Sequence, residues 1–420
     1  MTNVLDDLDR AYPAGPTLPD NWLDPSQRHP GALDETMQPF GSSRMLPAAA
    51  YTSPQVLAWE KRYLFAGTWT CVGREADLRT APDPDAAVTQ RALVVGDVPV
   101  VLTWSGEDIH AFANTCRHRA HELLADGETD AKRFVTCPYH AWSYKLDGTL
   151  KNAPSYRGLE GFDVDEYGLV ELPVERWQGW VFVHAANSIA DGGAPVDFKT
   201  HLGDMAGLVE PYKVDSLQLA ARHSYEVNAN WKVITENYHE CYHCPSIHPE
   251  LCEVTPPTSG DNYVLPGAWV GGSMDLRDGM ETMSITGKSE GVPLPGVSPT
   301  QVLYLGLWPN LLVSPHPDYV LAHRMIPLAP DRTWVECSWY MPERPDGGRV
   351  DPSYAEEFWD ITNKQDWSAC ESVQRGLSSP HFSPGPFSPS EDAVHQFTTM
   401  VGRGYRGEPM HLAHPLADSF

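Results

Sequence analysis

Two short cysteine and histidine motifs constrain this chain more than any other feature of its sequence. The first reads C-x-H and the second C-x-x-H, with eighteen residues between them. Each motif supplies one thiolate and one imidazole. Soft thiolates suit an iron–sulfur cluster, and two histidines in place of two cysteines on one iron raise its reduction potential. The spacing therefore predicts a [2Fe-2S] cluster held by Cys116, His118, Cys137 and His140.

A Cys2His2 zinc site is the alternative for these four side chains. Zinc fingers begin with a C-x2-4-C pair and end with an H-x3-5-H pair, which keeps like ligands together. Here each motif contributes one ligand of each kind, so the pattern favours the cluster. The 8 cysteines are too sparse for a disulfide scaffold, and buried thiols or metal ligands are their expected roles.

A second group of metal-binding residue types lies close together in the segment ENYHECYHCPSIH. A helix is predicted from Trp231 to about Tyr242, and Glu240 and His243 are three residues apart, as on one helix face. Pro245 should break this helix and let His248 return to the same centre. Two imidazoles and one carboxylate on one face of Fe(II) leave positions open for dioxygen and substrate, so a distant acidic residue is required.

Both regions resemble the alpha subunits of Rieske non-haem iron oxygenases. CRHRAHELL and CPYHAWSYKLDGTL are similar to the two cluster loops of that family, although the family commonly has glycine in place of Ala120. The later segment is similar to its E/D-x-x-H-x-x-x-x-H motif. The resemblance implies that the two cysteines bind the inner iron and the two histidines the outer iron of the cluster. It also implies that His243 and His248 bind a mononuclear Fe(II).

The resemblance further implies a third iron ligand on a late helix, which we assign to Asp366 in FWDITNKQDWSACESVQRGL. Asp360 and Glu371 are the alternatives, and helical spacing lets only one of the three point at the iron. In the family, the acidic residue at the position of Glu240 bridges the two centres. It accepts one hydrogen bond from an iron-bound histidine and another from a cluster histidine of the adjacent subunit, and Asn237 could support this network.

Three neighbours of these residues have simpler interpretations. His239 lies off the family motif and is interpreted as a hydrogen-bonded, half-buried histidine. Cys241 and Cys244 could extend the segment into a zinc knuckle, but a closed structural zinc site would leave Asp366 without a role.

The fold class expected from the resemblance is α+β. A leader is predicted at 1–43, a β-rich Rieske [2Fe-2S] domain with a flanking helix at 44–188, and a helix-grip catalytic domain at 189–420, built from an antiparallel sheet and long helices. Residues 253–300 are rich in Gly and Pro and are predicted to form a long loop over the substrate entrance.

The resemblance implies O2-dependent hydroxylation or oxidative N-demethylation of a small organic substrate, a methylated or quaternary amine in the branch that includes glycine betaine, carnitine, choline and stachydrine oxygenases. Aromatic-ring hydroxylation is the alternative, and a Rieske electron carrier without oxygenase activity is the alternative from another class. A quaternary ammonium group needs an aromatic cage, for which Tyr304, Trp308 and Trp269 are available, and His323 could line the cavity.

The expected partners are an NAD(P)H-dependent reductase or ferredoxin and two further copies of the chain in a head-to-tail homotrimer. The net charge of -26, from 56 acidic and 30 basic residues, argues against nucleic acid as a partner. The amino terminus is acidic and lacks the apolar core of a signal peptide, and no apolar stretch approaches membrane length. A cytoplasmic location is therefore expected.

Overall fold

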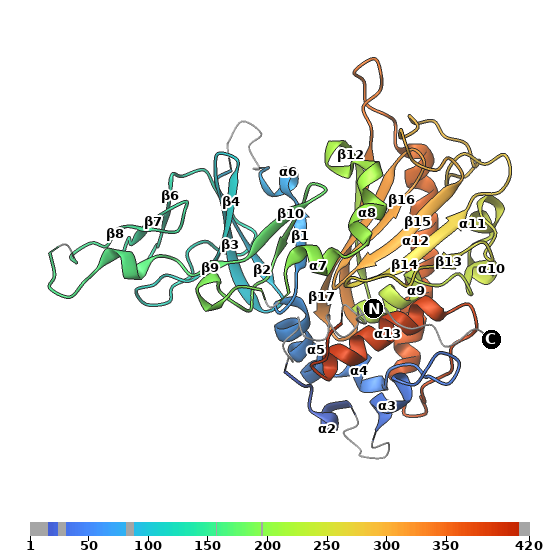
Figure 1. The fold of residues 1–420 in the computed structure, drawn as a ribbon, viewed down its shortest axis with the longest axis horizontal. Coiled ribbons are helices and arrows are strands. Elements are labelled where there is room, and N and C mark those ends of the chain that lie inside the picture. The colour runs from blue at the N-terminus through green and yellow to red at the C-terminus, as the bar shows by residue number, and fades with distance from the viewer. Residues whose placement is uncertain (1–15, 24–30, 81–87, 157, 195, 411–420) are drawn as a thin grey trace, which may run out of the picture. The chain divides into compact units, whose positions relative to one another are not determined.

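The computed structural model describes residues 16–23, 31–80, 88–156, 158–194 and 196–410. The chain divides into two compact units, one of residues 58–198 and one that combines residues 1–57 with residues 199–420 (Figure 1). Residues 44–57 thus belong with the C-terminal part of the chain, whereas the sequence suggested that they flank the cluster domain. Much of the predicted leader lies outside the described residues.

The unit of residues 58–198 consists of three antiparallel sheets with the strand orders β1-β11-β10, β5-β2-β3-β4-β9 and β6-β7-β8. Its strands are β1 (Thr70–Arg74), β2 (Gln90–Val95), β3 (Val98–Ser105), β4 (Asp108–Ala113), β5 (Thr129–Asp130), β6 (Phe134–Thr136), β7 (Ser143–Lys145), β8 (Leu150–Asn152), β9 (Glu171–Leu172), β10 (Val174–Trp177) and β11 (Trp180–Val183). Its helices are α6 (Glu75–Leu78) and the short turns η1 (Lys61–Phe65), η2 (Val164–Tyr167) and η3 (Ile189–Asp191). The β-rich character predicted for this region is confirmed.

The central strand β3 is buried on both faces and contributes to two apolar clusters of this unit. Val100, Leu102 and Trp104 follow one another at every second position of β3 and are almost completely buried. Because side chains of a strand alternate between two faces, these three side chains share one face, and Val101 on the other face packs in the second cluster. The turn between β2 and β3 has only two residues, and Gly96 takes a positive φ there, as tight hairpin turns require.

The other unit is built on a seven-stranded antiparallel sheet with the order β12-β18-β17-β16-β15-β14-β13. These strands are β12 (Gln218–Val227), β13 (Asp261–Asn262), β14 (Trp269–Asp275), β15 (Gln301–Leu307), β16 (Leu311–Pro315), β17 (Val320–Ala329) and β18 (Arg332–Met341). The helices are α2 (Asp20–Leu23), α3 (Ala32–Thr36), α4 (Ala48–Thr52), α5 (Pro54–Glu60, which continues into η1), α7 (Phe198–Leu202), α8 (Met205–Val209), η4 (Glu210–Tyr212), η5 (Val214–Ser216), α9 (Trp231–Tyr238), α10 (Cys244–Ile247), α11 (Pro249–Val254), α12 (Ser353–Leu377) and α13 (Asp392–Tyr405).

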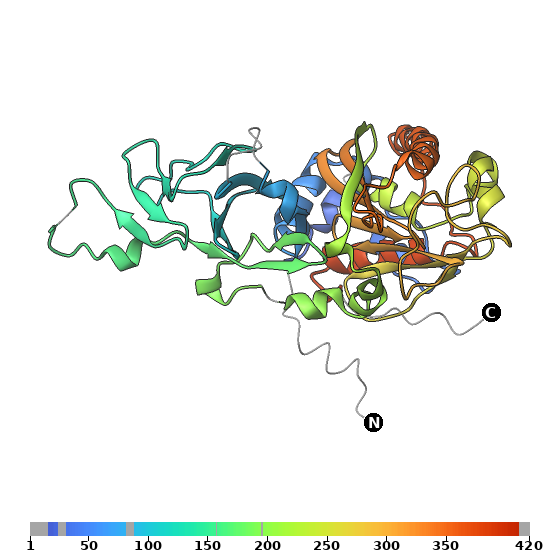
Figure 2. The same cartoon turned by 90° about the horizontal axis from the view of Figure 1, so that it is seen from above.

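Long helices pack against this sheet, as the predicted α+β class requires. The 25-residue α12 contacts β12 and α9, and α13 contacts β14 and α9 (Figures 1 and 2). Residues 301–341 form the consecutive strands β15 to β18, and the late helix expected to carry Asp366 forms as α12. These elements place the late acidic residues beside the segment that follows α9.

Two local predictions are wrong. Residues 253–300 are not one long loop, because β14 and β13 lie within them; Gly271 lies so close to β15 that a Cβ there would be 2.1 Å from the carbonyl oxygen of Tyr304. The glycines of this segment therefore allow close strand contact instead of marking a loop. The helix expected to continue to Tyr242 ends at Tyr238, and Pro245 lies in the first turn of α10, where proline is tolerated.

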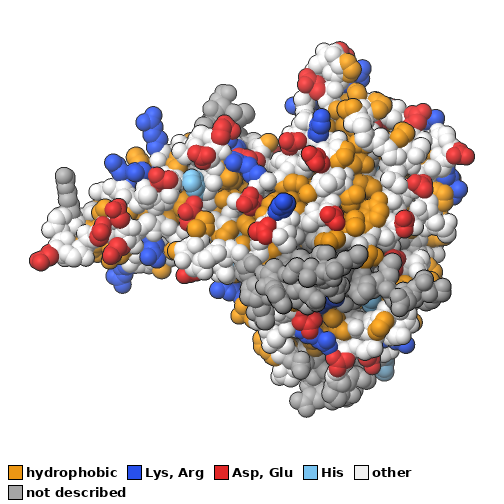
Figure 3. All heavy atoms as spheres, in the orientation of Figure 1, with side chains coloured by type: hydrophobic (Ala, Val, Ile, Leu, Met, Phe, Trp, Pro, Cys, Tyr) orange, Lys and Arg blue, Asp and Glu red, His pale blue; other side chains and the backbone are white. Residues whose placement is uncertain are grey.

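The surface matches the acidic composition. On the face in Figure 3, the coloured Asp and Glu side chains are interspersed with Lys and Arg, and the Lys and Arg side chains form no continuous patch there. Within the described part of the chain, the longest helices are too short or too polar to cross a bilayer.

Candidate metal centres

The four residues of the cysteine and histidine motifs come together at the tips of two loops. One loop follows β4 and the other joins β6 to β7. The loops have matching backbone hydrogen bonds: the Cys116 N–H donates to the His121 carbonyl at 2.8 Å, and the Cys137 N–H donates to the Trp142 carbonyl at 2.8 Å. Two equivalent turns therefore present one cysteine and one histidine each.

The burial of these side chains suits a cluster with one inner and one outer iron. Cys116 and Cys137 are buried free thiols, whereas His118 is half-buried and His140 is exposed. The two imidazole centroids lie 4.7 Å apart. The Nε2 of His118 lies 3.3 Å from the hydroxyl of Tyr156, but its buried Nδ1 has no hydrogen-bond partner among the described residues. This unpartnered atom is available to a metal ligand bond, so the residues fit a [2Fe-2S] cluster.

Tyr144 is a partner of the cluster loops that the sequence did not single out. Its hydroxyl oxygen accepts a hydrogen bond from the Arg117 N–H at 3.1 Å and lies 3.3 Å from the Cys116 sulfur. Burial, together with the bond to Cys116, raises the pKa of Tyr144, so the phenol keeps its proton. Since its oxygen already accepts one bond, its O–H can donate to the sulfur.

Tyr144→Phe should lower the reduction potential of the cluster by on the order of 50–100 mV, because a hydrogen bond to a charged sulfur is stronger when the cluster is reduced. The potential can be measured by redox titration of the cluster spectrum. Tyr167→Phe is the matched control. The ring of Tyr167 contacts Trp142, and no hydrogen bond of its hydroxyl is among the interactions described for this residue. Equal potentials for Tyr144→Phe and the unmodified protein would refute the effect of this bond.

The backbone at Ala120 and at Ala141, one in each cluster loop, explains why glycine suits these positions. Both have a φ of 57°, in the left-handed region that costs an L-residue with a Cβ about 1–2 kcal/mol. Ala120→Gly removes this strain but increases the backbone entropy of the unfolded chain. We expect a net stabilisation of up to about 1 kcal/mol, measured by urea unfolding of the cluster-loaded protein. Ala125→Gly, at an exposed loop position without a positive φ, should not stabilise, and equal effects of the two changes would contradict the strain.

The second predicted group converges as well. His243 lies just before α10, His248 ends it, and Asp366 lies on α12, more than a hundred residues later. The His248 Nε2 is 2.9 Å from the Asp366 Oδ1, the two Nε2 atoms are 3.2 Å apart, and the His243 Nε2 is 3.4 Å from the same oxygen. Ligand atoms that lie about 2.1 Å from one ion are separated by about 3.0–3.4 Å. The three atoms therefore fit one metal ion.

The electrostatics of this group also suit a cation. Burial would lower the pKa of His243, but hydrogen bonds to Asp366 and Glu240 outweigh it and raise that pKa to about 9. Burial would raise the pKa of Asp366, but its hydrogen bonds to His243 and His248 lower it. The carboxylates thus stabilise positive charge at this point, which a metal ion can supply in place of a proton.

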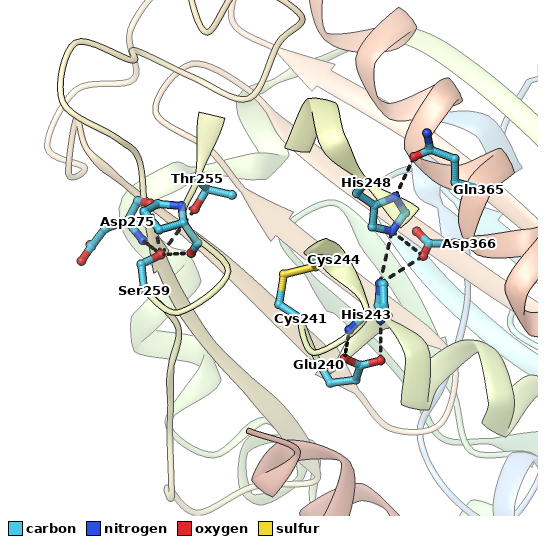
Figure 4. Close-up of a disulfide and its surroundings, with 11 residues drawn as sticks. Glu240, Cys241, His243, Cys244, His248, Thr255, Ser259, Asp275, Gln365 and Asp366 are labelled. Carbon is cyan, nitrogen blue, oxygen red and sulfur yellow. Dashed lines mark hydrogen bonds and ion pairs between the residues drawn. A yellow bond between two sulfur atoms is a disulfide. The ribbon is translucent and has the colours of Figure 1, made fainter. Parts of the chain in front are cut away.

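Two further side chains orient the imidazoles. Glu240 accepts hydrogen bonds from the Nδ1–H of His243 and from its backbone N–H, the latter at 3.0 Å (Figure 4). The His248 Nδ1 lies 2.7 Å from the Gln365 Oε1, a contact that the sequence did not reveal. In both histidines the Nε2 is left for the metal, which is the arrangement expected of ligands with an outer hydrogen-bond partner.

Cys241 and Cys244 form a disulfide on either side of His243 (Figure 4). The expectation of thiols or metal ligands at these positions is therefore wrong. The zinc knuckle, which was the disfavoured alternative, is excluded because a disulfide sulfur is not a thiolate. The bridge closes the loop that carries His243.

The competing carboxylates of α12 have other partners. Asp360 accepts a hydrogen bond from Tyr225 at 2.7 Å, and Glu371 accepts one from the Asn228 side chain at 2.9 Å. Neither belongs to the group formed by the two histidines and Asp366. The helix directs its acidic residues to different neighbours, as the spacing predicted.

A cavity of about 650 Å³ adjoins this centre. Its lining includes His243, His248, Asp366, Glu240 and Asn237, and also Tyr304 from β15.

The aromatic cage expected beside Tyr304 does not form. Trp308 packs against Trp231 and Phe397, and Trp269 donates a hydrogen bond to the Pro266 carbonyl. Trp269 is three residues along β14 from the partner of Tyr304, which is about 10 Å along a strand. His323 is buried against Tyr238 and lies 3.2 Å from the Asn363 Oδ1. None of these three belongs to the cavity lining.

His239 is not the hydrogen-bonded, half-buried histidine that was expected. It is 1% exposed, lines the cavity, and has no hydrogen-bond partner for either ring nitrogen among the described residues. Burial lowers its pKa to about 3, so the ring is neutral.

Family comparisons agree with both centres. Residues 68–163 match the Rieske [2Fe-2S] domain, and residues 214–407 match the catalytic domain of the ring hydroxylating alpha subunit. The chain belongs to the Rieske oxygenases, with a cluster-binding domain followed by a catalytic domain that binds a mononuclear iron. It is an oxidoreductase, and an electron carrier alone would not need the second domain.

The curated relatives act on methylated ammonium compounds according to their names. The glycine betaine monooxygenase oxygenase subunit of Chromohalobacter salexigens is 29% identical over 82% of this chain and 81% of its own length. The carnitine monooxygenase oxygenase subunit of Acinetobacter baumannii is 38% identical over 49% of this chain and 53% of its own length. The chloroplastic choline monooxygenase of Spinacia oleracea is 29% identical over 84% and 76%, respectively.

Solved structures show the same fold. The quaternary ammonium Rieske monooxygenase CntA is 25% identical, with a TM-score of 0.68 over 93% of this chain and 100% of CntA. Naphthalene 1,2-dioxygenase from Rhodococcus sp. is 17% identical, with a TM-score of 0.64 over 89% and 95% of the two chains, which shows a shared fold alone.

Proposed function

We propose that this chain is the oxygenase component of a cytoplasmic system that hydroxylates or oxidatively N-demethylates a quaternary or methylated amine. The observation that carries the proposal is the convergence of His243, His248 and Asp366 beside a cavity, in a chain whose relatives oxidise such amines. In this proposal, these three residues hold Fe(II), and Cys116, His118, Cys137 and His140 hold the cluster. The bound metals supply electron storage and oxygen activation.

The chain's own residues orient and enclose the reacting groups. Glu240 and Gln365 set the rings of His243 and His248, and the cavity holds the substrate away from bulk water. Hydroxylation of a methyl group consumes one O2, two electrons and two protons and yields the alcohol and water. An N-hydroxymethyl product then releases formaldehyde.

The electrons come from NAD(P)H through a separate reductase or ferredoxin. We infer a head-to-tail homotrimer in which the cluster of one subunit serves the iron of the next, because a ring of heterologous interfaces closes on itself. Glu240 would then connect His243 to a cluster histidine of the adjacent subunit, with Asn237 in support.

A substrate screen tests this function. Oxygen uptake and formaldehyde release would be measured with a generic NAD(P)H-dependent reductase on trimethylammonium compounds and on simple aromatic hydrocarbons. We expect coupled turnover on the ammonium compounds. Turnover of the aromatic compounds alone would replace the proposed function with aromatic-ring hydroxylation.

A further inference from the structure

The outer hydrogen-bond partners of the two iron-binding histidines differ in kind. The Nδ1–H of His243 donates to Glu240, and both oxygens of a carboxylate accept, so this partner serves in either orientation. The Nδ1 of His248 lies 2.7 Å from the Gln365 Oε1 (Figure 4). An amide accepts at one end and donates at the other, so Gln365 serves only when its oxygen faces the ring.

The orientation of this amide decides which nitrogen of His248 is free to bind iron. The His248 Nε2 lies 2.9 Å from the Asp366 Oδ1 and 3.2 Å from the His243 Nε2, where the three ligand atoms converge. The His248 Nδ1 must then carry the ring proton and donate it to the Gln365 Oε1. A reversed amide would present its NH2 group and stabilise the tautomer with the proton on Nε2, which cannot bind a metal.

Glu250 supplies the contact that fixes the amide. The Gln365 Nε2 donates a hydrogen bond to the Glu250 Oε2 at 3.3 Å. Because a carboxylate only accepts, the amide nitrogen faces Glu250 and the amide oxygen faces His248. This is the one hydrogen bond of the Glu250 side chain among the described residues. The partners at its two ends therefore determine the orientation of the Gln365 amide.

The fold brings these groups together from two helices. Gln365 and Asp366 are consecutive residues of α12, and the ring of His248 lies between them, with Nδ1 toward Gln365 and Nε2 toward Asp366 (Figure 4). Glu250 is a half-buried residue in the first turn of α11, two residues after His248. It does not belong to the cavity lining, so a role in substrate contact is not its function.

We propose that Glu250 is a positioning residue of the mononuclear iron site: it holds the Gln365 amide in the orientation that keeps the Nε2 of His248 free for the iron. The inference rests on the proposed iron ligands and adds to them a residue that acts through another side chain. The simpler role for Glu250 is stabilisation of α11, since an acidic residue in the first turn of a helix interacts favourably with the helix dipole.

Iron affinity tests the proposal. Fe(II) binding would be measured anaerobically, by equilibrium dialysis of radioactive iron, on cluster-loaded protein whose mononuclear site is empty. Glu250→Ala removes the acceptor and should weaken Fe(II) binding by roughly three- to tenfold, less than the loss of a direct partner of the ligand. Glu250→Gln keeps an acceptor oxygen but not the charge, so its loss should be smaller. Glu253→Ala, at an exposed position of α11, is the matched control and should bind iron like the unmodified protein.

A double-mutant cycle separates positioning from a structural role. Gln365→Leu removes the amide and should itself weaken Fe(II) binding by roughly tenfold or more. If Glu250 acts through Gln365, Glu250→Ala should cause no further loss in the Gln365→Leu protein. Stabilisation of α11 by Glu250, or direct attraction between its charge and the iron, would persist in that background.

The outcomes also separate this inference from the ligand assignment on which it rests. An unchanged affinity in Glu250→Ala, beside an Asp366→Ala protein that has lost its iron, would overturn the inference and leave the ligands standing. An equal loss in Glu250→Ala and Glu250→Gln, or the same loss in the Gln365→Leu background, would overturn it as well. Full iron binding by both Asp366→Ala and Gln365→Leu would overturn the ligand assignment together with the inference.

Discussion

Asp366→Ala should yield a protein with an intact cluster spectrum and an affinity for mononuclear iron reduced by at least about 100-fold. Asp366 supplies the one carboxylate oxygen within 3.4 Å of both His243 and His248 in the described site. Its loss leaves two neutral imidazoles, which bind Fe(II) weakly. The measurement compares total iron with acid-labile sulfide, and product formation should fall to background together with the excess iron.

Two carboxylates on the same helix provide the controls. Asp360→Ala and Glu371→Ala remove the same group from α12, but these side chains bond to Tyr225 and Asn228 instead. Both variants should retain mononuclear iron. If Asp366→Ala kept its full mononuclear iron and Asp360→Ala or Glu371→Ala lost it, the ligand role would belong to the residue whose removal costs the iron. Loss of the cluster spectrum in Asp366→Ala would argue against two separate metal sites.

The parts of the site that are close in sequence were predictable. The cluster residues follow from ligand type and spacing, because each loop is short and its donors cannot move apart. Asp366 was assigned by resemblance, with Asp360 and Glu371 left open, because helix periodicity excludes joint use of the three but does not choose among them. The choice depends on how α12 packs against α9, which is a tertiary contact.

The cavity was predicted least well. Tyr304 lines it, but Trp269 and Trp308 are core residues. The sequence does not distinguish an aromatic side chain that lines a cavity from one that packs in the core. His239 was misjudged as well, because nothing in the local sequence distinguishes a histidine without a hydrogen-bond partner from a hydrogen-bonded one.

Glu240→Gln should slow electron transfer to the mononuclear site by about 10- to 100-fold while both metals remain bound. Glu240 accepts two bonds from His243, one from the ring and one from the backbone. Glutamine has one acceptor oxygen, so its NH2 group must face one of these two N–H donors. The carboxylate charge beside the iron ligand is lost as well. The rate is read from reoxidation of the reduced cluster after mixing with O2 and substrate.

The matched control is Glu253→Gln, the same substitution at an exposed position of α11. It should leave the rate unchanged, because its carboxylate is solvated and has no ligand to orient. If Glu240→Gln reoxidised its cluster at the original rate, the bridging role would be refuted. If it lost iron instead, Glu240 would act on metal binding through His243. Slow reoxidation of the cluster in Glu240→Gln, with both metals fully bound, would support a role of the carboxylate in electron transfer between the two centres, because the metal content is then unaltered.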